Sequence, residues 1–125
     1  MTSWTAGYVA EIDYTHGFYR ELTPGLLSFA AALSNLASLP SLVKLRYCEL
    51  GCGQGFSANI IAAANPNAEV HATDFNPSQI AGARQLAEEG GLSNVHFHEK
   101  AFADFVDEPS LPESFDVIAL HGIYS

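Results

Sequence analysis

The spacing of apolar residues changes near residue 45, and this change divides the chain into two parts. Before it, apolar residues recur at helical spacing and form one stripe: Leu26, Leu27, Ala30, Leu33, Leu36 and Ala37. Thr23-Pro24 supplies a cap followed by a proline at the first helical position, and Leu39-Pro40 ends the pattern. We therefore expect residues 1–44 to form an N-terminal helical cap and residues 45–125 to form a separate unit.

From residue 45 onward, segments with strand patterns alternate with segments with helix patterns. Strands are predicted at residues 45–50, 69–73, 94–98 and 115–120, and helices at 56–65, 76–90 and 102–106. The second helix opens with Asn76-Pro77-Ser78-Gln79, which combines a cap, an N1 proline and a capping-box partner. The alternation predicts an α/β fold with a Rossmann-like, doubly wound parallel sheet in the order 3-2-1-4.

The last predicted strand contains Val117-Ile118-Ala119-Leu120, which is apolar on both faces. That pattern is typical of a central strand, yet the chain ends at Ser125. We therefore expect the chain to be a fragment that supplies only the first four strands of a longer fold. Because an open apolar edge favours pairing, we also expect this edge to be able to form a dimer.

Composition narrows the classes of partner. Of the 125 residues, 48% are hydrophobic and 15% are charged, which favours one folded domain over disorder. The net charge of −9 opposes binding to nucleic acid, which requires a basic face. No secretory signal opens the chain, and serines interrupt its longest apolar stretch, so we expect neither export nor membrane insertion, and a cytoplasmic location.

The cysteines and histidines do not predict a metal site. Cys48 and Cys52 are too close for a useful disulfide, so we expect reduced thiols in the strand and in the turn that follows it. His96 and His98 could form a metal pair at alternate strand positions. Polar positions on an edge strand explain them better, so we expect no metal.

The candidate chemistry centres on Glu49-Leu-Gly-Cys-Gly-Gln-Gly55, between the first predicted strand and the first predicted helix. Glycines at alternate positions allow a sharp turn, and a strand that ends this way at a helix N-terminus typically holds a small molecule. Asp74 ends the second strand, where a carboxylate can accept ribose hydroxyls. Phe75 could lie against an adenine face.

Two ligand classes fit this turn. Gly53-x-Gly55-x-x-Ala58 satisfies a dinucleotide fingerprint, so an NAD(P)-binding oxidoreductase is one alternative. Glu49 would repel the diphosphate of NAD, however, whereas S-adenosylmethionine carries a sulfonium and an ammonium. At an effective dielectric constant of about 20, two charges 4 Å apart interact by about 4 kcal/mol before desolvation. The sign of this interaction favours S-adenosylmethionine.

Three segments resemble motifs of one family. Glu49-Leu-Gly-Cys-Gly-Gln-Gly55, Asp74-Phe75 and Phe115-Asp-Val-Ile-Ala-Leu120 resemble motifs I, post-I and IV of the class I S-adenosylmethionine-dependent methyltransferases. The resemblance covers about residues 45–125. It implies methyl transfer from S-adenosylmethionine, with S-adenosylhomocysteine as product, to an acceptor that the sequence does not identify.

A narrower resemblance lies outside these motifs. Tyr14-Thr-His-Gly-Phe-Tyr-Arg-Glu-Leu-Thr-Pro24, Gly53-Gln-Gly-Phe-Ser-Ala-Asn59 and Leu120-His-Gly-Ile-Tyr-Ser125 are similar to bacterial methyltransferases that carry a downstream methyltransferase regulatory domain. In this family N-terminal segments often cover the cofactor. Four aromatic residues could do so here or could simply pack against the sheet: Tyr8, Tyr14, Phe18 and Tyr19.

The family resemblance implies roles for individual residues. The backbone of Gly51, Cys52 and Gly53 would face the methionine part of the cofactor, and Gly55 would belong to the same cofactor-binding turn. Glu49 would orient the turn or hold the amino group through water.

Further from the turn, the resemblance implies that Asp74 takes the ribose hydroxyls, that Phe75 packs on the adenine and that His121 lies near the methyl group. Lys100-Ala101 replaces the Gly-Asp of many members, so the adenine amino group would be met by the Phe102 backbone or by Asp104.

No catalytic residue is assigned by the sequence. His121 or His16 could act as a base, and neither is favoured. The alternatives to a methyltransferase remain an NAD(P)-binding domain and a non-catalytic binding or assembly module.

Overall fold

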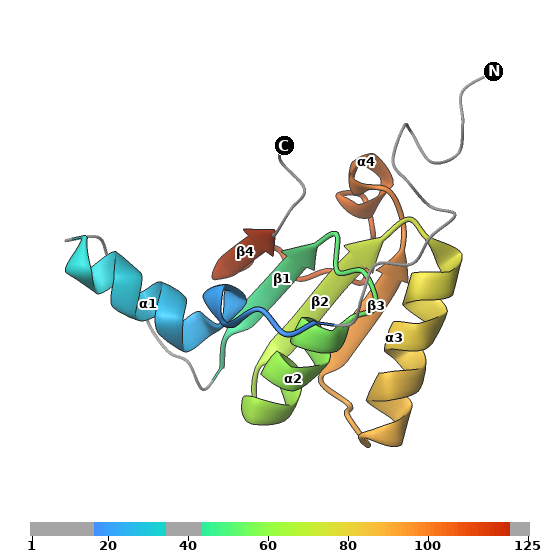
Figure 1. Cartoon of the computed structure of the whole chain (residues 1–125). Coiled ribbons are helices and arrows are strands. Elements are labelled where there is room, and N and C mark those ends of the chain that lie inside the picture. Colours follow the sequence, from blue (N-terminus) through green and yellow to red (C-terminus); the bar gives the residue numbers. More distant parts are fainter. Residues whose placement is uncertain (1–16, 35–43, 121–125) are drawn as a thin grey trace.

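The computed structural model describes residues 17–34 and 44–120 and contains a four-stranded parallel sheet (Figure 1). The strand order is β3-β2-β1-β4, as predicted. The strands are β1 (Arg46–Leu50), β2 (Glu69–Asp74), β3 (Val95–Glu99) and β4 (Val117–Leu120). Each lies within two residues of its predicted start and one residue of its predicted end.

The helices alternate with the strands. They are α1 (Pro24–Leu33), α2 (Phe56–Ala64), α3 (Pro77–Glu89) and the short α4 (Phe102–Phe105), and a 3-10 turn, η1 (Arg20–Leu22), precedes α1. In the described part of the chain, no helix is long and apolar enough to cross a lipid bilayer.

The core lies between one face of the sheet and the helices α2 and α3. Alternate strand residues turn toward the helices and are almost completely buried: Tyr47, Val70, Ala72, Val95, Phe97 and Ala119. The helices contribute small or branched residues to the same core: Ala58, Ile61, Ala62, Ile80, Ala83 and Ala87. The alanines allow a close approach between helix and sheet, so the carboxyl ends of the strands and the helix N-termini meet in a fixed arrangement.

The other face of the sheet is more polar. Cys48 of β1, His71 of β2 and His96 of β3 are register partners across this face. Phe105 of α4 packs beside His98, and Phe115 contacts His71 edge-on. The segment from α4 to residue 115 therefore crosses this second face.

The start of α3 differs from its prediction in one respect. Asn76 caps the helix, and its side chain accepts a hydrogen bond from the Ser78 amide at 3.1 Å. The capping-box prediction for Gln79 is wrong, because the Asn76 amide donates instead to Asp74 Oδ1 at 2.9 Å. The buried Gln79 Oε1 has no hydrogen-bond partner. An acid at the end of β2 has taken the place of the capping glutamine.

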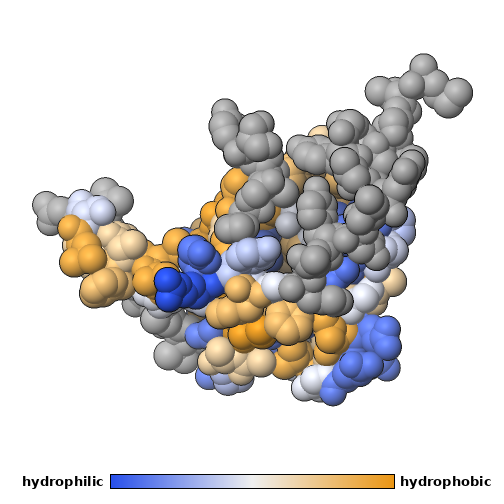
Figure 2. Space-filling view, in the orientation of Figure 1, coloured by the Kyte–Doolittle hydropathy of each residue, from blue (hydrophilic) through white to orange (hydrophobic). Residues whose placement is uncertain are grey.

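The N-terminal helix α1 extends from the body of the domain at the left of Figure 1. Thr23 is at its N-cap position, but its hydroxyl accepts no hydrogen bond from the helix amides and instead donates to Arg20 O. Leu26, Phe29 and Leu33 are exposed, and Figure 2 shows apolar surface along this helix. The predicted helix end at Leu39-Pro40 lies outside the described residues, and the division into a cap and a second unit remains a prediction.

The fourth strand is buried on one side only. Among the described residues, β4 pairs with β1 and with no other strand. Ile118 and Leu120 are exposed, while Ala119 is buried. This fits the prediction that an apolar strand lies at an open edge.

The packing of Gly55 yields the first testable prediction. Gly55 has φ +73°, and a Cβ at this position would lie 2.4 Å from Ala83 Cβ and 2.8 Å from a Phe97 ring carbon. We expect Gly55→Ala to lower the free energy of unfolding by roughly 2–5 kcal/mol, from backbone strain and overpacking. Urea denaturation measures this change.

The matched control is Gly82→Ala in the middle of α3, where the new methyl group meets no atom within 4 Å. Because alanine favours a helix, this variant should gain about 0.5–1 kcal/mol. A Gly55→Ala protein as stable as the wild type would show that α2 and α3 do not pack as closely as described.

Candidate functional site

The candidate site is the glycine turn that links β1 to α2. Gly51, Gly53 and Gly55 have φ of +73°, +57° and +73°, a backbone region that side chains with a Cβ rarely adopt. Gly55 is also the N-cap residue of α2. The glycines therefore serve the turn and the helix packing, and the turn leaves β1 at the carboxyl end of the sheet.

Most of the amide groups in this turn are already bonded within the protein. The amides of Gly51 and Cys52 both donate to the Thr73 carbonyl, at 2.9 and 3.0 Å. The Gly55 amide donates to Cys52 O at 3.0 Å. These donors are not available to an anionic ligand, although helix N-termini commonly bind one.

Asp74 holds the turn from the end of β2. Its Oδ2 accepts a hydrogen bond from the Gly53 amide at 3.0 Å, and its Oδ1 accepts from the Asn76 amide. Burial raises the pKa of Asp74, and the amide hydrogen bonds partly offset this effect. A carboxylate has about four lone-pair positions, so Asp74 can clamp the turn and still accept further hydroxyl groups.

Glu49 lies in β1, two residues before Gly51, and is the acid of the site with an unsatisfied oxygen. It is 4% exposed, and its Oε1 has no hydrogen-bond partner. Burial, followed by the nearby Asp74 carboxylate, raises the pKa of Glu49 to about 8. A buried acceptor without a donor is costly, so this oxygen marks a place where a ligand donor or cation would stabilise the site.

Gln79 and Gln54 extend this surface of acceptors. The Oε1 atoms of both side chains are buried and have no hydrogen-bond partner. A Cβ placed on Gly53 would meet Gln79 Oε1 at 2.9 Å, so this amide oxygen lies directly against the turn. The sequence marked Gln79 only as a capping partner, and only the packing of α3 against the turn shows its position.

Cys52 is present in the turn as a neutral thiol. Burial, followed by the Glu49 and Asp74 charges, raises the pKa of Cys52 well above its usual range. Cys48 in β1 is buried, and both cysteines are free, as predicted. A thiol with a raised pKa is a poor nucleophile, which agrees with the expectation that only the backbone of Cys52 serves the site.

The segment after β3 reaches the same edge of the sheet. The Lys100 amide donates to the Asp74 carbonyl at 3.1 Å, and Thr73 Oγ1 donates to the Lys100 carbonyl at 2.7 Å. Phe102 follows as the exposed first residue of α4. Phe75, directly after β2, is half-buried.

Two residues of the N-terminal segment also belong to this edge. The Tyr19 amide donates to Ser57 Oγ at the start of α2, and Ser57 Oγ donates to Gly17 O. Phe18 and Tyr19 are exposed. Sequence analysis did not identify Ser57, since a serine in a helix carries no sign of a distant partner. Tyr8, Tyr14 and the predicted site residue His121 lie outside the described residues.

The assignments of individual site residues remain predictions: Glu49, Gly51, Cys52, Gly53, Gly55, Asp74, Phe75, Phe102 and His121. The structure shows that Glu49, Asp74 and the glycine turn lie together at the carboxyl ends of β1 and β2.

This geometry defines a Rossmann-like nucleotide-cofactor domain, and similarity to known proteins identifies its family. Residues 42–124 match the methyltransferase domain family. An uncharacterized protein of Synechocystis sp. is 51% identical over 124 residues, which are 98% of this chain and 24% of that protein. Ribosomal RNA small subunit methyltransferase G of Streptococcus pyogenes is 30% identical over 110 residues, 88% of this chain and 42% of that protein.

Among solved structures, PKMT2 from Rickettsia typhi in complex with AdoHcy has a TM-score of 0.80 at 23% identity, and the match covers 90% of this chain and 21% of that one. The chain belongs to the methyltransferase domain family, which confirms the resemblance to class I methyltransferases. It spans less than half the length of each of these three proteins. The narrower resemblance to methyltransferases with a regulatory domain stays a prediction.

The buried Glu49 carboxyl predicts a dependence of stability on pH. Its pKa is about 8 in the folded protein and near 4.5 in an unfolded chain. Between these values the unfolded chain has lost the proton that the folded protein keeps. The contribution of Glu49 to the free energy of unfolding is therefore fully present below about pH 4.5. It is lost as the pH rises to about 8, by up to about 1.4 kcal/mol per pH unit.

We expect Glu49→Gln to remove this pH-dependent loss of stability. In urea denaturation, the free energy of unfolding of the variant should therefore rise relative to that of the wild type from pH 5 to pH 8. Glu113→Gln, at an exposed carboxylate, is the control and should show a constant difference. A pH-independent difference for Glu49→Gln would mean that the carboxyl is ionised and satisfied in the folded protein.

Proposed function

We propose that this domain binds S-adenosylmethionine at the glycine turn and provides the cofactor half of a methyltransferase. The observation that carries the proposal is the pair of acids, the buried Glu49 and the half-buried Asp74, beside a turn whose amides are largely used within the protein. Such a site offers oxygen acceptors and negative charge. It suits a ligand that brings an ammonium, a sulfonium and ribose hydroxyls.

The same observation weighs against the dinucleotide alternative. A diphosphate needs amide donors in the glycine turn and at the start of the helix, and the turn amides of Gly51, Cys52, Gly53 and Gly55 donate within the protein. The fingerprint Gly53-x-Gly55-x-x-Ala58 is better explained by Gly55, which lets α2 approach α3 and β3.

Each residue has a proposed task. Glu49 would meet the cofactor amino group directly or through one water molecule, and Asp74 would accept ribose hydroxyls with its remaining lone pairs. Phe75 and the Phe102 backbone would border the adenine, and His121 would lie near the methyl group. The bound cofactor supplies an electrophilic methyl group for in-line transfer, and the protein orients it and excludes water.

The methyl acceptor is not identified. One relative is named as a ribosomal RNA methyltransferase, but it is matched over only 42% of its length. The net charge of −9 weighs against RNA binding by this part of the protein. Two free cysteines are consistent with a cytoplasmic location.

An assembly role through β4 is a second candidate. Exposed Ile118 and Leu120 beside an unpaired strand edge, among the described residues, would suit pairing with another strand. Sedimentation analysis tests this assembly role. Pairing through β4 would give a dimer, whereas cofactor binding requires no association between chains.

Calorimetric titration of the chain with S-adenosylhomocysteine tests the proposed function. We expect binding at high micromolar ligand together with the release of up to one proton per site at about pH 6.5, because the ligand ammonium lowers the raised pKa of Glu49. Titrations in two buffers of different ionisation enthalpy measure this proton. Glu49→Gln should abolish the release and weaken binding about tenfold or more.

The control ligand is NADH, which should give no heat. Binding of NADH alone would reverse the assignment in favour of an oxidoreductase. Binding of S-adenosylhomocysteine without proton release would retain the cofactor but contradict the role of Glu49.

A further inference from the structure

A second cluster of chemically active side chains lies on the opposite face of the sheet, away from the glycine turn. Glu69, His71 and His96 each place one ligand atom so that all three atoms lie within 4.8 Å of one another. We propose that these three residues bind a divalent transition-metal ion of the Zn²⁺ class.

The topology explains why the three side chains meet. Glu69 and His71 are two residues apart on β2 and therefore project from the same face. His96 is the register partner of His71 on β3. Neighbouring strands are about 4.8 Å apart, so the two imidazole rings are adjacent, with ring centroids 4.7 Å apart.

The donor set suits this kind of ion. Two imidazoles and one carboxylate form a common set of zinc ligands, and the fourth position is left to water. Ligand atoms in a tetrahedral zinc site are about 3.3 Å apart, given bonds of about 2.0–2.1 Å. His71 is buried and fixed, whereas His96 is exposed and the Glu69 side chain is 45% exposed. Small rotations of these two outer side chains would close the site.

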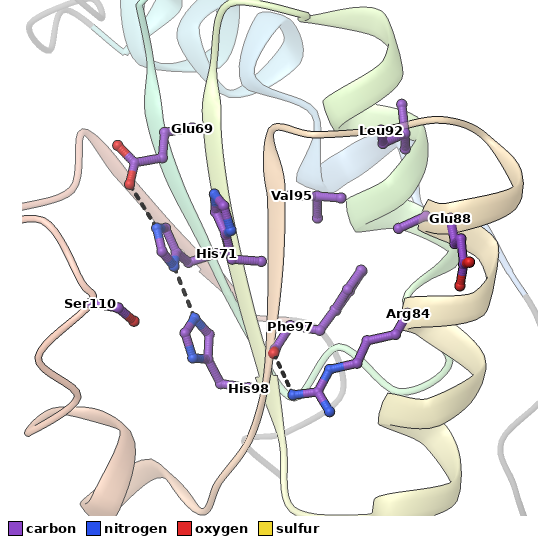
Figure 3. A pocket seen from close by; sticks show the side chains of 11 residues that line it. Glu69, His71, Arg84, Glu88, Leu92, Val95, Phe97, His98 and Ser110 are labelled. Carbon is purple, nitrogen blue, oxygen red and sulfur yellow. Dashed lines mark hydrogen bonds and ion pairs between the residues drawn. The ribbon is translucent and has the colours of Figure 1, made fainter.

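His98 supplies the support that metal-bound histidines usually have. Figure 3 shows the chain of contacts from Glu69 through His71 to His98. His71 Nε2 lies 2.8 Å from Glu69 Oε1, and His71 Nδ1 lies 2.9 Å from His98 Nε2. With the ion on Nε2, the His71 proton would reside on Nδ1 and be donated to His98, which fixes the ring.

The space around the cluster permits this ion. An open hollow of about 690 Å³ is lined by Glu69, His71, His96 and His98 and also by Ser110. Ser110 is held there through Glu108, which also binds Lys100. Water or a small ligand could therefore reach the fourth position.

The cluster is separate from the cofactor site. Glu69 begins β2 and Asp74 ends it, which places them about 16 Å apart at 3.3 Å per residue. The two residues also belong to opposite faces of the sheet. The ion would thus link the edge strand β3 to β2 and take no part in methyl transfer.

Titration of the chelator-treated chain with zinc chloride tests the proposal, and cobalt chloride provides a visible spectrum. We expect one ion per chain, a cobalt spectrum of nitrogen and oxygen ligands without a thiolate band, and a raised melting temperature. His96→Ala, at an exposed position, should weaken binding at least 100-fold. His98→Gln should weaken it about 10–100-fold.

Two controls separate this site from adventitious binding. Glu99→Gln removes an exposed carboxylate of the same strand, and the double variant His16→Asn/His121→Asn removes the remaining histidines. Both should bind zinc as the wild type does. Circular dichroism and S-adenosylhomocysteine titration of His96→Ala should be unchanged.

Three results would overturn the proposal. They are the absence of zinc binding by the wild type at high micromolar metal, equal binding by His96→Ala, and loss of binding in the His16/His121 double variant. A shift of the His71 ring proton from Nε2 to Nδ1 on metal addition, seen by nitrogen NMR, would support it directly.

Discussion

The hydrogen bonds between the end of β2 and the turn after β1 are the constraint on which the site depends. Thr73 O accepts from Gly51 and Cys52, and Asp74 Oδ2 accepts from Gly53. These three bonds fix the path of the chain into α2 and use three amide donors of the turn within the protein. The chemical character of the site follows in part from them, because the Thr73 carbonyl and the Asp74 carboxylate take up three amides of the turn, while Glu49 leaves an acceptor oxygen free of any donor.

The same arrangement explains why Glu49 is kept in an unfavourable environment. A pKa raised from 4.5 to about 8 means that ionising this carboxyl in the folded, ligand-free domain costs several kcal/mol. A cation about 4 Å away returns about 4 kcal/mol at an effective dielectric constant of 20. The two magnitudes are similar, so a bound ammonium can remove the proton from Glu49. The acid is thus poised between two protonation states by burial and by ligand charge.

Elements that depend on local sequence were predictable, and those that depend on packing were not. The strand order and the turn followed from apolar periodicity and from the position of the glycines. The capping role of Gln79 was wrong because Asp74, from the preceding strand, reaches the Asn76 amide first. The need for glycine at position 55 comes from Ala83 and Phe97, which the sequence does not show to be its neighbours.

The metal cluster shows the same limit in a sharper form. In the sequence, His96 and His98 are the candidate metal pair because they are two residues apart on one strand. By themselves they supply only two ligands. The set that does converge takes two ligands from β2 and one from β3, and only the pairing of His71 with His96 brings them together. An edge strand has a neighbour on one side only, so cross-strand contacts decide its stability. A polar face on β3 is therefore best understood through β2, whose His71 joins Glu69, His96 and His98 into one connected group.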